Sequence, residues 1–117
     1  MKLYFAAPLF SKAETKFNAS LTDDIEGHGI DVFLPQRDTP KNIDNFDELN
    51  SDSFSEEIYS VNRDAILNSD VLLAILDGST IDSGVATEIA IGHENDIQTV
   101  GLKTDDRILT ERENVNA

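Results

Sequence analysis

The most apolar run in the 117-residue chain, VLLAIL at residues 71–76, is closed at once by an Asp-Gly pair. An unbroken apolar run of this length, ended by turn residues, is typical of a β-strand that is buried on both faces. A helix is predicted to begin a few residues later, because Asp82 is a favoured N-cap residue and Val85 and Ile89 recur at helical spacing. In an α/β sheet, the loop that joins such a strand to such a helix lies where ligands bind. The stretch 71–92 therefore constrains both the fold and the place of a site.

Strand and helix patterns alternate along the rest of the chain. Strands that alternate with helices are joined by right-handed crossovers and form a parallel sheet. We expect a single α/β domain over residues 1–117, doubly wound like flavodoxin or Rossmann folds, with about four to five parallel strands flanked by helices. The expected strands cover residues 2–7, 30–34, 71–76 and 99–102, and the expected helices cover residues 11–26, 53–68 and 83–94.

The first two predicted helices each begin with a capping box, in which a Ser is followed three residues later by a Glu. These boxes start at Ser11 and Ser53, and Gly27 and Gly29 are expected to end the first helix. Apolar residues at helical spacing predict the buried faces. They are Ala13, Phe17, Leu21 and Ile25 in the first helix, and Phe54, Ile58, Val61 and Ala65 in the second.

Two segments between these helices are polar. Residues 35–40 are predicted to form a loop at the carboxyl end of the second strand. Residues 41–52 are rich in acidic and polar side chains, with few apolar residues that could anchor them. They are predicted to form a mobile loop that acts as a lid.

An excess of acidic side chains sets the charge of the chain. It holds 23 Asp and Glu against 9 Lys and Arg, which gives a formal net charge of −14. Nucleic acids and anionic membranes are bound through basic patches, so neither is expected as a partner. A solvated acidic surface is the plain explanation of this charge, and adaptation to high salt is the sharper one.

Signatures of targeting, cofactors and metals are absent from the sequence. No apolar run approaches membrane-spanning length, and the chain begins directly in its first predicted strand without a signal-peptide pattern, so we expect a cytoplasmic protein. The lack of Cys excludes a disulfide framework and thiolate metal sites. Neither a dinucleotide-binding glycine fingerprint nor a phosphate loop follows a predicted strand. We therefore expect no cofactor and no metal.

Several polar side chains are expected near the carboxyl ends of strands or on the adjoining helices. They are Tyr4, Gln36 with Arg37, Asp64, and Asp82 with Glu88. Each also has a plain structural reading, in which Tyr4 is a core residue, Asp82 an N-cap and Asp64 a surface residue. Glu88 differs because it interrupts an otherwise apolar turn of its helix. A carboxylate in such a place is either paired with a partner or used in chemistry.

Four segments of the chain together resemble the nucleoside 2-deoxyribosyltransferases. They are YFAAPLFS at residues 4–11, FLPQRD at 33–38, NRD at 62–64, and the stretch from the Asp-Gly pair to IAIG at 77–92. The last segment is the most specific, because its spacing, its glycines and both of its acids agree with the family. The resemblance implies a doubly wound α/β fold.

The resemblance also implies a two-step, retaining glycosyl transfer. Glu88 would attack the anomeric carbon of a 2′-deoxynucleoside and expel the base, and a second base or water would then attack the glycosyl ester. Tyr4 would orient Glu88, Asp64 would handle the proton of the leaving base, and Asp82 would hold a sugar hydroxyl. The other residues that this resemblance places around the substrate are Gln36, Arg37, Ser83 and Gly84.

The same resemblance implies a homodimer or a larger homo-oligomer with shared active sites. Asn116 looks like the Asn that reaches into the neighbouring subunit's site. The family usually continues past this residue, so the usual C-terminal element is expected to be shortened or missing in this chain.

Two alternatives stand beside the transferase. One is a hydrolase that cleaves 2′-deoxynucleoside 5′-monophosphates, and the other is a non-catalytic nucleotide-sensing module of the same fold. Phosphate-binding relatives carry a Ser-like residue where this chain has Asp82, whose negative charge would repel a 5′-phosphate. A deoxynucleoside and a nucleobase are therefore the expected small-molecule partners.

Overall fold

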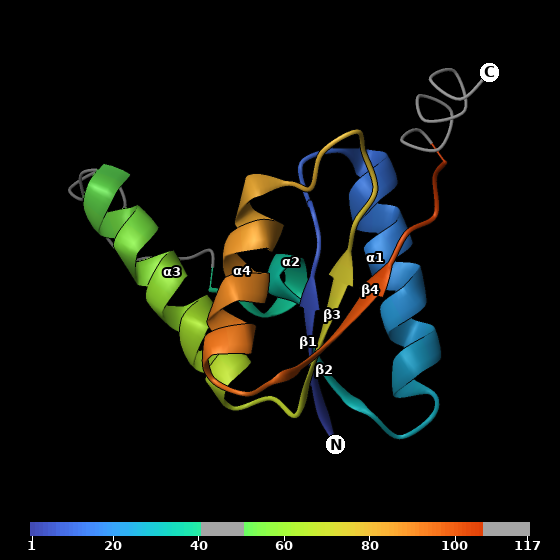
Figure 1. Ribbon diagram of the computed structural model, residues 1–117, viewed down its shortest axis with the longest axis horizontal. Coiled ribbons are helices and arrows are strands. Elements are labelled where there is room, and N and C mark those ends of the chain that lie inside the picture. The colour runs from blue at the N-terminus through green and yellow to red at the C-terminus, as the bar shows by residue number, and fades with distance from the viewer. Residues whose placement is uncertain (41–50, 107–117) are drawn as a thin grey trace.

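A computed structural model describes residues 1–40 and 51–106 of the chain, with side chains from residue 56 onward in the second range. Four strands alternate with helices along these ranges, as the sequence predicts (Figure 1). The elements in chain order are β1 (Lys2–Ala6), α1 (Lys12–Glu26), β2 (Asp31–Phe33), α2 (Pro35–Asp38), α3 (Ser51–Leu67), β3 (Val71–Ile75), α4 (Ser83–Glu94) and β4 (Gln98–Leu102).

The four strands form one parallel sheet in the order β2-β1-β3-β4. The chain passes from β1 to β2 on one side and later returns to place β3 on the other side of β1. This reversal creates a switch point between β1 and β3, and in open α/β sheets ligands bind outside the carboxyl ends of the strands at such a point. The predicted doubly wound α/β fold is therefore confirmed.

Side chains alternate along the strands and build one core on each face of the sheet. Tyr4 and Leu72 point to the face that Ile66 of α3 and Val85 of α4 cover. Phe5 and Leu3 point to the opposite face, where Leu21 and Ile25 of α1 pack. Figure 1 shows α1 on one side of the sheet and α3 with α4 on the other. The apolar run in β3 contributes to both cores, so its predicted burial on both faces is confirmed.

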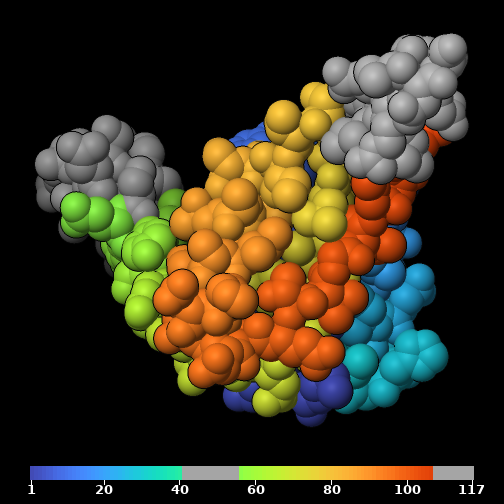
Figure 2. Space-filling view, in the orientation of Figure 1, coloured from blue at the N-terminus to red at the C-terminus, as the bar shows by residue number. Residues whose placement is uncertain are grey.

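The strand β4 lies at an edge of the sheet and is more open to solvent than β3. It runs beside α4 on the face that the space-filling view presents (Figure 2). The side chain of Val100 is 45% exposed. Gly92 of α4 packs close to the sheet, where a Cβ atom would lie 3.4 Å from a methyl carbon of Leu72. This close approach fixes α4 against the centre of the sheet.

The helix α1 begins and ends as predicted, but its buried face differs from the prediction. Both hydrogen bonds of the capping box at Ser11 are present, and Gly27 is the C-cap. The predicted stripe is wrong in its first half, because Ala13 and Phe17 are exposed. Asn18 is buried instead, since its amide finds two acceptors, the carbonyl oxygen of Pro8 and Oε1 of Gln36. A satisfied polar side chain can thus take a buried position that spacing alone assigns to apolar residues.

Two further predictions need correction. Residues 35–38 form the short helix α2 rather than a loop, with Pro35 at its first position, where the missing N–H costs nothing. The helix α3 begins at Ser51, so the last two residues of the predicted lid are helical, and residues 41–50 lie outside the described ranges. Among the residues of α3 whose side chains are described, Ile66 is fully buried, while Ile58, Val61 and Ala65 are half-buried. Phe54 lies among the residues whose side chains are not described.

Candidate active site

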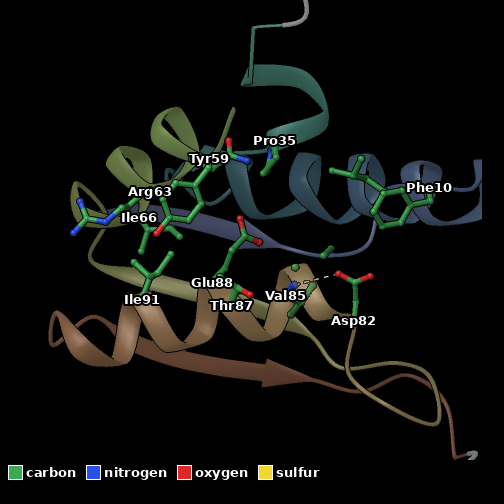
Figure 3. A pocket seen from close by; sticks show the side chains of 14 residues that line it. Phe10, Pro35, Tyr59, Arg63, Ile66, Asp82, Val85, Thr87, Glu88 and Ile91 are labelled. Atoms are coloured by element: carbon green, nitrogen blue, oxygen red, sulfur yellow. Dashed lines mark hydrogen bonds between the residues drawn. The ribbon is translucent and has the colours of Figure 1, made fainter. Parts of the chain in front are cut away.

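A cavity of about 270 Å³ opens beyond the carboxyl end of β1, between α3 and α4 (Figure 3). Its wall is mostly apolar, and three carboxylate or amide side chains face it: Asn62, Asp82 and Glu88. Leu9 and Phe10 of the segment after β1 close one side. The cavity therefore lies at the switch point of the sheet, where the fold predicts a ligand site.

Glu88, which lines this cavity, is hydrogen-bonded to the buried Tyr4. The Tyr4 hydroxyl donates to Oε2 of Glu88 across the space between β1 and α4. Tyr4 itself is fully buried, and its ring stacks on Phe33 of the neighbouring strand with centroids 5.6 Å apart. Figure 3 shows Glu88 projecting from α4 into the cavity toward α3. A rigid donor thus holds one carboxylate oxygen in place.

Burial dominates the electrostatics of Glu88. Removal from water raises the pKa of its carboxyl to about 7, the Tyr4 hydrogen bond opposes this rise, and the negative charge of Asp82 adds to it. Burial and the charge of Glu88 both raise the pKa of the Tyr4 hydroxyl, so Tyr4 stays protonated and remains a donor. A carboxyl whose pKa lies near neutrality is poised for proton transfer or nucleophilic attack.

Asp82 places a second carboxylate at the start of α4. Its Oδ2 accepts a hydrogen bond from the Val85 backbone N–H at 3.1 Å, so the predicted N-cap is confirmed. The same side chain lines the cavity. Gly84 leaves it room, because a Cβ atom at that position would lie 3.2 Å from Oδ2 of Asp82. Asp82 therefore serves the helix and faces the cavity with the same carboxylate.

Comparison with known proteins identifies the family. The family model described as nucleoside 2-deoxyribosyltransferase matches residues 3–116. The chain belongs to this family. No curated protein sequence gives a significant match.

Solved structures agree with this assignment. A conserved protein from Enterococcus faecalis V583 is 37% identical over 98% of this chain and 74% of its own, with a TM-score of 0.79. The 2-deoxyribosyltransferase of Bacillus psychrosaccharolyticus is 18% identical over 92% of this chain and 80% of its own, with a TM-score of 0.76. The enzyme of the same name from Leishmania mexicana is 17% identical over 89% of this chain and 65% of its own, with a TM-score of 0.69. The last two show a shared fold.

This member of the 2-deoxyribosyltransferase family brings only part of the predicted site together. Tyr4 contacts Glu88, and Asp82 and Gly84 line the same cavity. Gln36 lies in an adjoining hollow of about 260 Å³, where its amide bonds the Thr15 carbonyl oxygen and Asn18. Ser83 is exposed and does not line the cavity, and Asn116 lies outside the described residues.

The structure does not bring Arg37 to the cavity. Its guanidinium donates two hydrogen bonds to Glu26, at 3.1 and 3.2 Å, and two to Asp38, at 2.8 and 3.0 Å. It also donates to the carbonyl oxygen of Val32 in β2. The hydrogen bonds that Arg37 donates to Asp38 raise its pKa most, followed by those that it donates to Glu26. The side chain therefore joins α1, β2 and α2 at a distance from Glu88, which the sequence pattern could not reveal.

Asp64 is also absent from the cavity, because it lies on another face of α3. The residues of α3 that line the cavity are Tyr59, Asn62, Arg63 and Ile66. Their spacing of three and four residues defines one stripe of the helix, whereas Asp64 is exposed outside it. The sequence pattern did not single out Asn62, because helical spacing alone does not show which face of α3 lines the cavity. Asn62 accepts a 2.7 Å hydrogen bond from the Thr39 hydroxyl.

Within residues 1–40 and 51–106, no three or more His, Asp or Glu side chains gather in a group that could hold a metal ion. No helix in those ranges is long and apolar enough to cross a membrane.

Proposed function

We propose that this protein transfers the 2-deoxyribosyl group of a 2′-deoxynucleoside to another nucleobase or to water. The observation that carries the proposal is the hydrogen bond from the buried Tyr4 to Glu88, whose carboxylate lines an apolar cavity at the switch point of the sheet. Burying a carboxylate is costly unless it is paired or used. Here one oxygen of Glu88 is held by Tyr4, and the other remains for chemistry. The family supports the same reaction.

In the first step, the ionised carboxylate of Glu88 attacks the anomeric carbon. The C1′–O bond to Glu88 forms while the C1′–N bond to the base breaks, and the electron pair of that bond stays on the base nitrogen. A proton from solvent neutralises the departing base. The two negative charges of Glu88 and Asp82 stabilise the positive charge that develops on the sugar ring in an oxocarbenium-like transition state.

In the second step, a ring nitrogen of another base, or a water oxygen, attacks the same carbon. The new bond to C1′ forms while the ester bond to Glu88 breaks, so the carboxylate is restored and the acceptor loses a proton to solvent. Two displacements on one carbon retain its configuration. Tyr4 holds the same carboxylate oxygen through both steps, which limits the motion that each attack requires.

Asp82 favours a nucleoside over a nucleotide. Its carboxylate lines the cavity and raises the pKa of Glu88, so the two charges interact. A 5′-phosphate placed about 4 Å from it would meet a repulsion of about 1 to 4 kcal/mol. The hydroxyl of a sugar can instead donate a hydrogen bond to the carboxylate. A monophosphate hydrolase is therefore the less favoured activity, and a non-catalytic sensor would have no use for the Tyr4–Glu88 pair.

The rim of the cavity supports a site completed by a second subunit. Phe10 is 80% exposed and Tyr59 is 52% exposed, although both line the cavity. Large apolar side chains gathered at one opening are typical of surfaces that contact another molecule. We expect a homodimer or a larger homo-oligomer, which sedimentation at equilibrium would test. A monomer that is fully active at all concentrations would contradict this expectation.

Product analysis tests the proposed function. Deoxyinosine or thymidine is incubated with the protein, with and without adenine, and the products are separated by chromatography. Deoxyadenosine forms only with adenine if the protein is a transferase, whereas free base alone reports hydrolysis. Glu88→Gln should form neither product, while Glu94→Gln, at the exposed end of the same helix, should match the wild type. Wild-type protein that releases no base from any deoxynucleoside would refute the proposal.

A further inference from the structure

The amide of Asn62 is held at a defined place in the wall of the cavity. Asn62 lies on the stripe of α3 that lines the cavity, between Tyr59 and Ile66, and Figure 3 shows both of these residues on the same side of Glu88. The Thr39 hydroxyl donates to Oδ1 of Asn62 at 2.7 Å. Thr39 is itself fixed as the C-cap of α2, where its backbone N–H donates to the Pro35 carbonyl oxygen. The carbonyl end of the Asn62 amide is thus engaged, and its amino end is left as a donor.

Apart from the hydroxyl of the exposed Tyr59, the other polar side chains around the cavity are committed to hydrogen bonds or carry a charge. The Thr87 hydroxyl donates to the Ser83 carbonyl oxygen at 2.9 Å, and Glu88 is bonded to Tyr4. Asp82 accepts from the Val85 backbone N–H. Arg63 is exposed, and in Figure 3 its guanidinium extends away from Glu88. Among the described residues, Asn62 therefore offers a neutral, half-buried donor in the same cavity as the carboxylate.

We propose that Nδ2 of Asn62 binds the base of the substrate by donating to the acceptor beside its glycosidic bond, N3 of a purine or O2 of a pyrimidine. This inference rests on the proposed function, which places the anomeric carbon next to Glu88. This acceptor is two bonds from the glycosidic nitrogen and lies on the sugar side of the ring, so it is the hydrogen-bonding atom of the base nearest to that carbon and shares the small cavity with Asn62.

The same donor aids departure of the base. As the C1′–N bond breaks, negative charge spreads over the base ring and reaches the acceptor that Asn62 contacts. A fixed donor aimed at developing charge is stronger in the transition state than in the bound substrate, so it accelerates the step. Asn62 thus replaces part of the charge neutralisation that a carboxylic acid would otherwise supply, and Thr39 acts as its positioning residue.

A cycle of protein and substrate changes tests this role. The rate kcat and kcat/KM are measured for 2′-deoxyadenosine, its 3-deaza analogue and its 7-deaza analogue, with wild type and Asn62→Ala. Asn62→Ala should lower kcat about 100-fold for deoxyadenosine and for the 7-deaza analogue. It should lower kcat less than about threefold for the 3-deaza analogue, which has no acceptor to lose. Equal losses for all three substrates would overturn the inference.

One control variant, one substitute variant and one binding measurement keep this test decisive. Asn68→Ala removes another Asn just beyond α3, outside the cavity, and should leave all three rates unchanged. Asn62→Ser replaces Asn62→Ala in the cycle if thermal melting shows that the latter does not fold. Calorimetric binding of adenine and 3-deazaadenine needs no turnover, so it separates failure of this inference from failure of the proposed function. The wild type should bind adenine about tenfold more tightly than 3-deazaadenine, whereas Asn62→Ala should bind the two bases equally. Equal binding of the two bases to the wild type would refute the contact.

Discussion

Replacing Tyr4 with Phe removes one hydroxyl from the centre of the site and little else. Tyr4 is fully buried, its ring stacks on Phe33, and Phe can keep the same packing. The lost hydrogen bond ends on a charged oxygen of Glu88, and such bonds contribute about 1.5 to 3 kcal/mol. Because one pKa unit corresponds to about 1.4 kcal/mol, the pKa of Glu88 should rise by at least about one unit from its value of about 7.

The pH profile of kcat/KM reports this shift, since only the ionised carboxylate attacks. At pH 6 a group with a pKa of about 7 is roughly one-tenth ionised, and one with a pKa of about 8 is roughly one-hundredth ionised. Tyr4→Phe should therefore lose about tenfold more activity at pH 6 than at pH 9. Tyr59→Phe changes a half-exposed Tyr of the same cavity and should keep the wild-type midpoint. A loss for Tyr4→Phe that is the same at every pH would refute the reasoning.

Three further predictions follow from the same charges. Asp82→Ser should shift the ratio of kcat/KM for deoxyadenosine and its 5′-monophosphate toward the monophosphate. The fold should persist because Ser still caps α4, and the backbone N–H groups freed at the start of α4 favour an anion. An unchanged ratio would contradict this. The raised pKa of Glu88 contributes stability that is complete below its ordinary value of 4.5 and is lost as the pH rises through about 7. In urea unfolding, Glu88→Gln should therefore stabilise the fold by about 2 to 3 kcal/mol at pH 8 and little at pH 4.5. Equal effects at both pH values would contradict this. The net charge of −14 predicts a melting temperature that rises between 0.05 and about 3 M KCl, with much of the gain at modest salt, where screening acts within about 10 Å; a flat melting temperature would show that the acidic surface is incidental.

The fold was predictable where the sequence pattern is local and strong. The apolar run of β3, the Asp82 cap and the helix that follows coincide with the observed elements, because one continuous stretch carries the strand, turn and cap signals together. The Tyr4–Glu88 contact joins residues 84 positions apart. No local pattern encodes such a contact, and it was expected only through the family resemblance.

The site residues on α3 show why the rest was not predictable. Apolar residues occur on two adjacent faces of this helix, one with Ile58 and Val61 and the other with Tyr59 and Ile66. Helical spacing cannot decide which of these faces the cavity, because the rotation of a helix is set by what packs on it. The second face lines the cavity, so Asn62 enters and Asp64 does not. Arg37 likewise depends on Glu26, a partner on another helix.

The central claim is that Glu88 forms a covalent bond to the sugar. The most direct measurement is mass spectrometry of protein that is mixed with a 2′-deoxynucleoside, quenched in acid within one turnover and digested to peptides. The account predicts that the peptide containing Glu88 gains the mass of one 2-deoxyribosyl group, and that Glu88→Gln protein gains none. Turnover of the deoxynucleoside without any adduct, or an adduct on a different residue, would contradict it.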